Sequence, residues 1–450
     1  MKPKKADLQR RLFETPLDEI INMEHPLVIL ASKIDWTSLE ETFGKLYVPN
    51  FGRPGLPTRL MVGLHYLKYA FDQSDESAVA MFLENPYWQY FCGLKYFSHE
   101  MPFDPSSMTR WRKRLSKSDS EALLQETIQT ALRTEAMKPK EITRVNVDTT
   151  VQEKAVAYPT DVRNYDKGRK LLVRIAKKRG IELRQSYARV GEELQRQQSR
   201  YAHARQMKRA AKATKRLKTY LGRVIREVDR NIEKLTDREQ KILALVKRLY
   251  EQKRDDKNKI YSLHAPEVEC IAKGKAHKKY EFGCKASVVS TNATNWIIGA
   301  EACHGTPYDG HTFSEALSQV KRLTGYEVKE AYCDKGYRLK KEEMPENCHM
   351  FIPGGRKRNS AEKKRMKRRN AIEPIISHLK YDHRLGRNYL RGILGDVRNV
   401  ILAACGFNMR ELLRAFLYLW LRSFLERFSN VKHLFEDVLL RLSGKYYLHA

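Results

Sequence analysis

The chain lacks the features of a membrane protein or of a disulfide-stabilised secreted protein. Basic residues at its start are not followed by an apolar run, so no signal peptide is expected. The 7 cysteines are scattered and include no Cys-x-x-Cys pair, which argues against a disulfide framework or a zinc ribbon and favours a reducing compartment. The most apolar stretch, residues 401–425, is not expected to span a bilayer, because four charged residues interrupt it: Arg410, Glu411, Arg414 and Arg422.

Acidic residues are scarce relative to basic ones. The 450 residues include 85 Lys and Arg but 54 Asp and Glu, which gives a formal net charge of +31. A surface this positive attracts polyanions, of which nucleic acid is the commonest large one. A ribosome-like or merely soluble basic protein is the alternative. The length predicts two or three domains of roughly 150 residues each, and a hydrophobic content of 42% can build their cores.

Residues 1–138 carry helical patterns throughout and form the first predicted domain. The pair Asp104-Pro105 predicts a helix start, because proline is favoured directly after an N-cap residue. The helix that follows bears Arg110, Arg112 and Arg114. Short helices that end in one basic helix fit a DNA-binding domain of the helix-turn-helix kind, in which these arginines contact DNA. A helical bundle with an ordinary solvated basic face is the alternative.

A strand and then a basic helical block follow this domain. Residues 144–151 alternate apolar and polar side chains and include β-branched residues, which predicts a strand. Residues 161–260 contain 31 Lys and Arg against 13 Asp and Glu, an excess of 18 positive charges. We expect residues 161–263 to form an insertion of two or three long antiparallel helices. It either clamps DNA phosphates or forms a solvated coiled coil that spaces or dimerises subunits.

Strand patterns resume after the insertion, over residues 280–289, 296–302, 328–334 and 350–353, with a helix near residues 311–323. They predict a mixed α/β (α+β) fold, in which one long insertion interrupts a mixed sheet after its first strand. The expected boundaries are 1–138 for an all-α N-terminal domain, 139–160 and 264–395 for the core, 161–263 for the insertion and 396–450 for C-terminal helices.

Three acidic residues are candidates for metal-dependent chemistry, since phosphoryl transfer uses divalent metals held by carboxylates. Asp148 lies within the first predicted strand and Asp334 at the end of a later one, where an Asp is more often a turn or cap residue. Arg369, Glu373 and Lys380 fall within about 40° of one another if the segment is helical. They form either a carboxylate between two cations or an exposed ladder of ion pairs. The proline after Glu373 predicts that the helix begins or bends there.

These residues resemble the acidic triad of DDE insertion-sequence transposases: Asp148, Asp334 and Glu373, with the signature Arg369-x-x-x-Glu373-x-x-x-x-x-x-Lys380. The broader signature has Tyr three residues before the Arg, where this chain has Met366, so a tyrosine contact to a flipped base or hairpin is not expected. Further motifs are similar to the branch often called insertion-sequence family five: Leu56-Pro57-x-Arg59, Asp104-Pro105-Ser106-Ser107, Lys273-Gly274-Lys275, Pro307-Tyr308-Asp309-Gly310-His311-Thr312 and Asp334-Lys335-Gly336-Tyr337.

The resemblance covers nearly the whole chain and implies an RNase H-like catalytic core. Asp148 on the first strand, Asp334 after the fourth and Glu373 on the helix behind it are then expected to hold two Mg²⁺ ions, for which Mn²⁺ can substitute. The implied chemistry begins with attack of water on the phosphodiester at the transposon end. The freed 3′-hydroxyl then attacks target DNA.

The resemblance also implies contacts with DNA around the triad. Asp309 and His311 either line the site or, for Asp309, cap a helix. Phosphate contacts are expected at four cations: Arg369, Lys380, Lys335 and Arg338.

We therefore expect a transposase that binds the terminal inverted repeats of an insertion sequence, cleaves its ends and joins them to target DNA. Its expected partners are double-stranded DNA and a second copy of the chain, without a membrane, in the bacterial cytoplasm at the nucleoid. Two alternatives remain open. One is a non-mobilising nuclease of the same fold, and the other is an inactive or domesticated sequence-specific DNA-binding protein that uses the basic domains alone.

Overall fold

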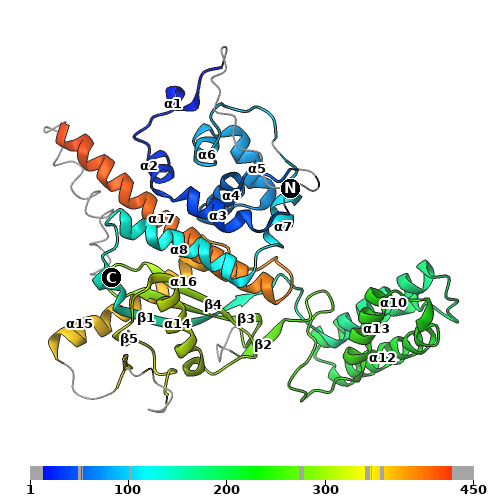
Figure 1. The fold of residues 1–450 in the computed structure, drawn as a ribbon. Helices are drawn as coiled ribbons and strands as arrows, with labels where there is room; N and C mark the ends of the chain where they lie inside the picture. Colours follow the sequence, from blue (N-terminus) through cyan, green and yellow to red (C-terminus); the bar gives the residue numbers. More distant parts are fainter. Residues whose placement is uncertain are drawn as a thin grey trace. The chain divides into compact units, whose positions relative to one another are not determined.

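The computed structural model describes residues 14–427 apart from residues 49–51, 53, 102, 273–277, 340–344, 346 and 355–358. The motif Lys273-Gly274-Lys275 lies outside the described residues. The chain forms two compact units, which we call unit 1 (residues 1–153 and 285–450) and unit 2 (residues 154–284) (Figure 1). Among the described residues, no helix combines the length and the apolar character that a membrane span requires.

Unit 1 begins with helices, as the sequence predicted. The central helix α4 (Thr58–Ala70) is buried at every position except Arg59, because neighbouring helices cover it on all sides. The other helices of this region are α1 (Leu17–Ile20), α2 (Pro26–Lys33), α3 (Trp36–Gly44), α5 (Asp75–Glu84), α6 (Pro86–Phe91), α7 (Ser106–Arg112), α8 (Lys117–Arg133) and α9 (Pro139–Ile142).

The C-terminal helix α17 (Ile393–Arg427) joins these helices to the sheet of unit 1. It packs against α2, α4 and α8 on the helical side and against strand β4 (Ile297–Cys303) on the other, and Figure 1 shows it beside α8. One continuous apolar core results. The boundaries predicted near residues 138 and 396 therefore do not separate compact units, because the apolar faces of α4, α8 and α17 cover one another.

The sheet of unit 1 contains the strands that the sequence predicted. Their order is β4, β3 (Tyr280–Thr291), β1 (Arg144–Glu153), β5 (Glu330–Tyr332) and β6 (His349–Phe351). Strand β4 is antiparallel to β3, whereas β5 is parallel to both β1 and β6. The amide of Asn292, just after β3, donates to the carbonyl of Arg144 at the start of β1, so these two central strands are antiparallel. Helix α14 (Phe313–Thr324) packs against β4 and α8.

Helical structure returns after the sheet in three consecutive pieces. Helix α15 (Ser360–Arg368) is followed by a 3₁₀ turn at Arg369–Ala371 and then by α16 (Ile372–Tyr381). Pro374 lies in the first turn of α16, where the lack of an amide proton is tolerated. The predicted start of a helix near Glu373 is thus confirmed to within one residue.

Unit 2 contains the predicted basic insertion. Its helices are α10 (Asp161–Lys178), α11 (Ala188–His203), α12 (Met207–Asp229) and α13 (Asp237–Glu251), which pack around an apolar core of their own. The expectation of two or three helices was too low, because the polar stretches between them gave no proline signal for a break. Strand β2 (Glu269–Ala272) pairs antiparallel with the first residues of β3.

Candidate active site

Two of the predicted acids lie side by side because their strands are neighbours. In the parallel pair of β1 and β5, Asn146 is the partner of Tyr332. Asp148 and Asp334 each lie two residues beyond this position. Since side chains repeat every two residues along a strand, both carboxylates lie on the same side. The two carboxylates are close enough to interact, and the negative charge of Asp334 raises the pKa of Asp148.

A third carboxylate, that of Asp309, joins this pair. A methyl group built on Gly336 would lie 2.9 Å from Asp334 Oδ1 and 3.3 Å from Asp309 Oδ2, so the two carboxylates flank the same glycine. The amide of Gly336 donates to Asp334 Oδ1 over 2.6 Å, which orients that side chain. Asp309 is the first residue of its 3₁₀ turn, Asp309–Thr312, whose N-cap is Tyr308, and its Oδ1 accepts from side chains on two strands instead. Of the two predicted roles for Asp309, the structure therefore favours lining the site.

Lys285 and Thr149 hold Asp309 in place, and the sequence analysis missed both. The ammonium of Lys285 and the hydroxyl of Thr149 donate to the same oxygen, Asp309 Oδ1, over 2.8 and 2.7 Å. The other oxygen, Oδ2, is the one that faces Gly336. Thr149 directly follows Asp148, but Lys285 lies on β3, and no local sequence pattern links it to Asp309.

Arg369 connects the third triad member to the other acids. One guanidinium nitrogen, Nη2, lies 3.1 Å from Asp148 Oδ2, and Nη1 lies 3.7 Å from Glu373 Oε1. Asp148 and Arg369 are largely buried, whereas the side chain of Glu373 is 67% exposed. The structure thus brings Asp148, Asp334 and Glu373 to one site, with Arg369 between two of them.

Burial dominates the electrostatics of Asp148. It raises the pKa of the Asp148 carboxyl to about 6, although the charge of Arg369 and the hydrogen bond from the Thr149 amide act in the opposite direction. The charges of Asp334 and Asp309 raise this pKa further. The four carboxylates of the site carry more negative charge than Arg369 and Lys285 together neutralise, which favours the binding of a further cation.

The predicted phosphate contacts are distributed unevenly around this site. Lys335 and Arg338 are exposed on the loop that follows Asp334, and Lys380 is partly exposed on α16. Arg110 is exposed on α7, and Arg114 is exposed just after that helix. Both belong to the helical region of unit 1 and are distant in sequence from the acids. His311 is exposed within the 3₁₀ turn that carries Asp309.

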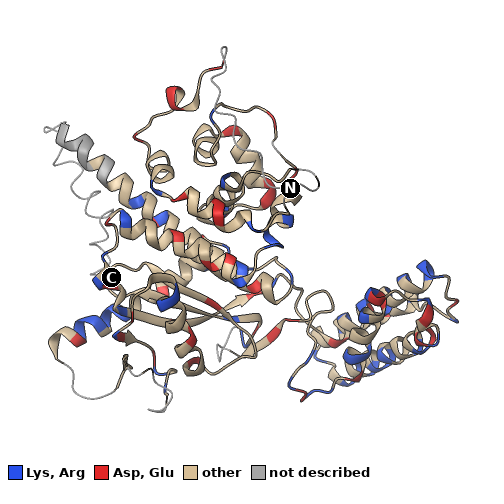
Figure 2. Cartoon of the chain, viewed as in Figure 1, with Lys and Arg blue, Asp and Glu red and all other residues tan. Residues whose placement is uncertain are grey.

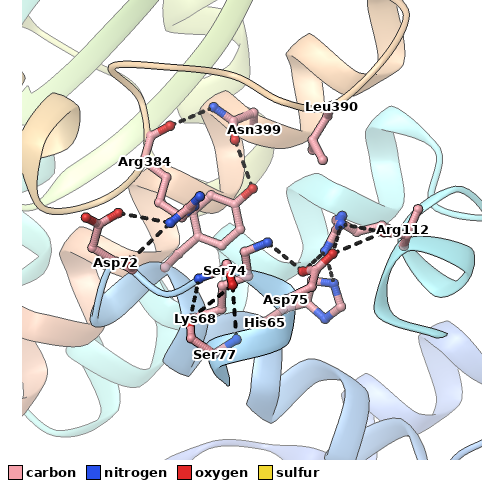
Figure 3. Close-up of polar contacts among 12 residues, drawn as sticks. His65, Lys68, Asp72, Ser74, Asp75, Ser77, Arg112, Arg384, Leu390 and Asn399 are labelled. Atoms are coloured by element: carbon pink, nitrogen blue, oxygen red, sulfur yellow. Dashed lines mark hydrogen bonds and ion pairs between the residues drawn. The ribbon is translucent and has the colours of Figure 1, made fainter. Parts of the chain in front are cut away.

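Arg112 does not present its guanidinium to solvent, which corrects its predicted role as a DNA contact. Its side chain is 4% exposed and forms a two-pronged ion pair with Asp75, over 2.8 and 2.6 Å (Figure 3). Lys68 also pairs with Asp75, and Arg112 donates to Nε2 of His65. Arg112 thus fixes α7 against α4 and α5. Helical spacing places Arg112 on the buried face with Met108 and Trp111, whereas Arg110 lies on the exposed face of α7.

Comparisons with known proteins bear on the helical region and on the family. Residues 15–114 match a family model described as "Transposase domain (DUF772)". The chain is also 54% identical over 195 residues to "Uncharacterized protein ORF8 in nfe locus" of Rhizobium meliloti, an alignment that covers 43% of this chain and 94% of that protein. The chain belongs to an insertion-sequence transposase family.

The matched transposase domain and the acidic site lie in different parts of unit 1. The matched transposase domain covers helices α1 to α7, including the buried pair of Arg112 and Asp75. The acidic site lies outside the matched residues, on the sheet and on α16. No solved structure matches the chain, so the acids are interpreted from their geometry.

Proposed function

We propose that this transposase is a DDE enzyme that cleaves the ends of an insertion sequence and joins their 3′-hydroxyls to target DNA. The observation that carries this proposal is the gathering of Asp148, Asp334 and Glu373 around Arg369, although they come from distant parts of the chain. Four carboxylates that include Asp309, with cations at the rim, form a centre for phosphoryl transfer. Assignment to the insertion-sequence family five branch is part of the same proposal.

The position of each acid supports an RNase H-like core. Asp148 lies on the first strand of unit 1, Asp334 follows its fourth strand β5, and Glu373 lies in the helical segment after the sheet. This is the order and placement that the resemblance implies. The antiparallel pairs β4–β3 and β3–β1, continued by parallel β5 and β6, provide a mixed sheet of the required kind.

The donor set fits a magnesium site. Every candidate ligand is a carboxylate oxygen, the donor that Mg²⁺ and Mn²⁺ prefer. Asp148, Asp334 and Glu373 would hold the ions, with Asp309 as an adjoining carboxylate. When bound, divalent ions at such a site supply charge that activates an attacking oxygen and stabilises a leaving one.

The cations of the chain would bind and orient the DNA. Arg369 has a buried Nε–H for which the described residues supply no acceptor. A phosphate bound beside the acids would meet the terminal nitrogens of this guanidinium, since such groups bind phosphate through two N–H groups at once. Lys335, Arg338 and Lys380 would add charge along the DNA backbone. Lys285 and Thr149 hold Asp309 in position, because both donate to its Oδ1.

The alternative of an inactive DNA-binding protein is disfavoured by the intact acidic site. Selection for binding alone would not require three or four carboxylates close to a DNA phosphate, where they repel it. A non-mobilising nuclease would retain the acids but would not join ends. The products of the reaction separate these possibilities.

The test uses the full chain, a duplex cloned from the DNA that flanks its gene, and a supercoiled plasmid as target. We expect strand cleavage at the element end in Mg²⁺ or Mn²⁺, followed by covalent joining of that end to the plasmid. Cleavage without joined product would indicate the nuclease. Specific binding with no metal-dependent cleavage at all would contradict the proposal.

A further inference from the structure

Helix α12 in unit 2 has one face that is committed to the core. Its buried residues recur every three or four positions and contact the apolar cluster of this unit. The exposed positions on the opposite side of the helix have no such packing role. The buried residues are Ala210, Ala213, Leu217, Leu221, Gly222, Val224, Ile225 and Val228.

The outer face of α12 carries a basic stripe that is interrupted at one exposed uncharged position, Thr219. Helix α12 contains no Asp or Glu before Glu227. At about 100° and 1.5 Å per residue, the stripe is about 80° wide and about 27 Å long. Figure 2 shows the Lys and Arg residues of unit 2 in blue. The exposed side chains that form the stripe are Lys208, Lys212, Lys215, Arg223 and Arg226.

The acidic side chains nearest the end of α12, and the buried Glu239, have partners other than the stripe residues. Glu239 pairs with Arg179. The two acids at the end of α12 are occupied too: Asp229 pairs with Lys247, and Glu227 accepts from the amide of Arg184. Within the described part of unit 2, no ion pair joins an acid to any of the five stripe residues.

An aromatic pair anchors one end of the stripe. Tyr187 and Tyr220 stack with their ring centroids 4.3 Å apart and their planes within 7°. Arg223 donates to the hydroxyl of Tyr187, and Arg216 donates to that of Tyr220, each over 3.1 Å. The guanidinium of Arg223 is thereby held in place at the surface, which lowers the entropy lost when it binds a partner.

The chemistry of this surface selects duplex DNA among possible partners. A second copy of the same stripe would be repelled by like charge. A membrane would require the apolar face of the helix, which is buried. Single-stranded DNA is bound on exposed aromatic platforms, but Tyr187 and Tyr220 stack on each other. A straight row of cations, about as long as eight base pairs, matches the phosphates of a duplex.

We propose that the outer face of α12 is a docking surface for double-stranded DNA that contacts phosphates without reading sequence. This inference rests on the proposed function, which supplies DNA as the ligand, and it adds a surface of unit 2 that binds this DNA. Because lysine is a point charge with no preferred base edge, this surface contributes affinity rather than recognition of the terminal repeat.

The experiment measures binding of the full chain to a labelled random duplex of about 30 base pairs, by fluorescence anisotropy in EDTA. The test variant carries Lys208→Gln, Lys212→Gln, Lys215→Gln and Arg226→Gln. Each phosphate contact contributes about 0.9 to the slope of log affinity against log salt. We expect at least about a 30-fold loss of affinity near 100 mM salt and a slope shallower by about 3 to 4.

A control variant removes the same number of charges from another part of unit 2. It carries Lys234→Gln, Arg238→Gln, Lys241→Gln and Lys253→Gln, all at exposed positions on or beside α13. We expect its affinity to change less than about threefold, because acidic residues flank these bases. Circular dichroism establishes that both variants are folded.

Equal losses in the two variants, or no loss in the test variant, would overturn the inference. The inference would also be overturned if the test variant lost more affinity for a single strand of the same length than for the duplex. The binding assay needs no cleavage, so its outcome is separate from the proposed catalysis. If the chain binds DNA as expected but never cleaves it, the docking surface is supported and the proposed catalysis is contradicted. If it cleaves DNA but the test variant binds normally, the catalysis is supported and the docking surface is contradicted.

Discussion

Asp148 and Arg369 form an ion pair of 3.1 Å across 221 residues of sequence. The same guanidinium lies 3.7 Å from Glu373, so one arginine is shared by two of the three acids proposed to hold metal. It lowers the repulsion between carboxylates that are otherwise crowded together. Its position also places a phosphate-binding group beside the proposed reaction centre.

The first prediction concerns the triad itself. Asp148→Asn, Asp334→Asn and Glu373→Gln each remove one charge with little change of shape, so the fold should survive. Each should lower metal-dependent cleavage by several orders of magnitude, because a neutral amide is a poor ligand for Mg²⁺. DNA binding without metal, measured by anisotropy, should be unchanged or slightly tighter.

The matched control for the triad is Glu362→Gln. Glu362 is an acid of the same segment, but its carboxylate accepts from the amide of Asn359 in the capping box of α15. This variant should keep nearly full cleavage. Cleavage that survives in Glu373→Gln and disappears in Glu362→Gln would exchange the roles of the two residues.

The second prediction concerns Asp309 and the lysine that holds it. Asp309→Asn and Lys285→Gln should each reduce cleavage by about 10- to 100-fold, the usual effect of losing a partner close to a metal site. Glu315→Gln changes an exposed acid of the following helix and should have little effect. Titration of Mn²⁺ by electron paramagnetic resonance should show weaker binding in Asp309→Asn. Unchanged Mn²⁺ affinity would exclude this carboxylate from the site.

The third prediction concerns Arg369. Replacing it with Gln should reduce cleavage by more than about tenfold, because the phosphate loses a two-pronged charged partner. Replacing it with Lys should restore part of the activity, since charge returns without the planar fork. Equal activity of the Gln and Lys variants would mean that Arg369 acts through shape rather than charge.

The fourth prediction concerns the buried ion pair of the transposase domain. Burial alone would raise the pKa of Asp75, but the bonds and charges of Arg112 and Lys68 lower it well below its usual value. Asp75→Asn leaves both cations buried without a counter-charge and should lower the free energy of unfolding by about 3 to 5 kcal/mol. Urea denaturation measures this loss.

Asp72→Asn is the control for this pair. Asp72 pairs with Arg384 over 3.3 Å, but its side chain is half exposed (Figure 3). Its replacement should therefore cost less than about 1 kcal/mol. If both variants lost the same stability, burial would not explain the cost of breaking the Asp75 pair.

The fifth prediction concerns the pH dependence that His65 imposes. Burial and the charge of Arg112 lower the pKa of His65 to about 3. As the pH falls below about 6.5, the unfolded chain binds a proton at this residue and the native chain does not, so stability falls. Between pH 7 and pH 5 the loss should reach about 2 kcal/mol.

His65→Gln isolates this contribution to the pH dependence. His65 donates through Nδ1 to the carbonyl of Met61 and accepts at Nε2 from Arg112, and a glutamine amide can do both without titrating. The free energies of unfolding of the two proteins should converge as the pH is lowered from 7 to 5. Parallel pH profiles would show that His65 is not the titrating group.

The sequence predicted the strands because they depend on local pattern, whereas the grouping of the acids followed from the resemblance to DDE transposases. Strand β1 lies where its pattern predicted it, although both of its faces are largely buried, and Glu373 lies on a helix that begins near its proline. The partnership of Lys285 with Asp309, and of Arg112 with Asp75, could not be predicted in this way. Each depends on packing between segments that are distant in sequence: helical spacing puts Arg112 on the buried face with Met108 and Trp111, but it does not identify the acidic partner.

The two connections of unit 2 have an evolutionary consequence. Unit 2 starts directly after β1 and ends within β3, and these strands are neighbours in the sheet. The chain therefore leaves and re-enters the sheet at nearly the same place, as it does at a hairpin loop. A segment with adjacent ends can be lengthened, shortened or exchanged without altering the strand order. Descendants of a common ancestor can thus keep the acidic centre and differ widely in the basic helices.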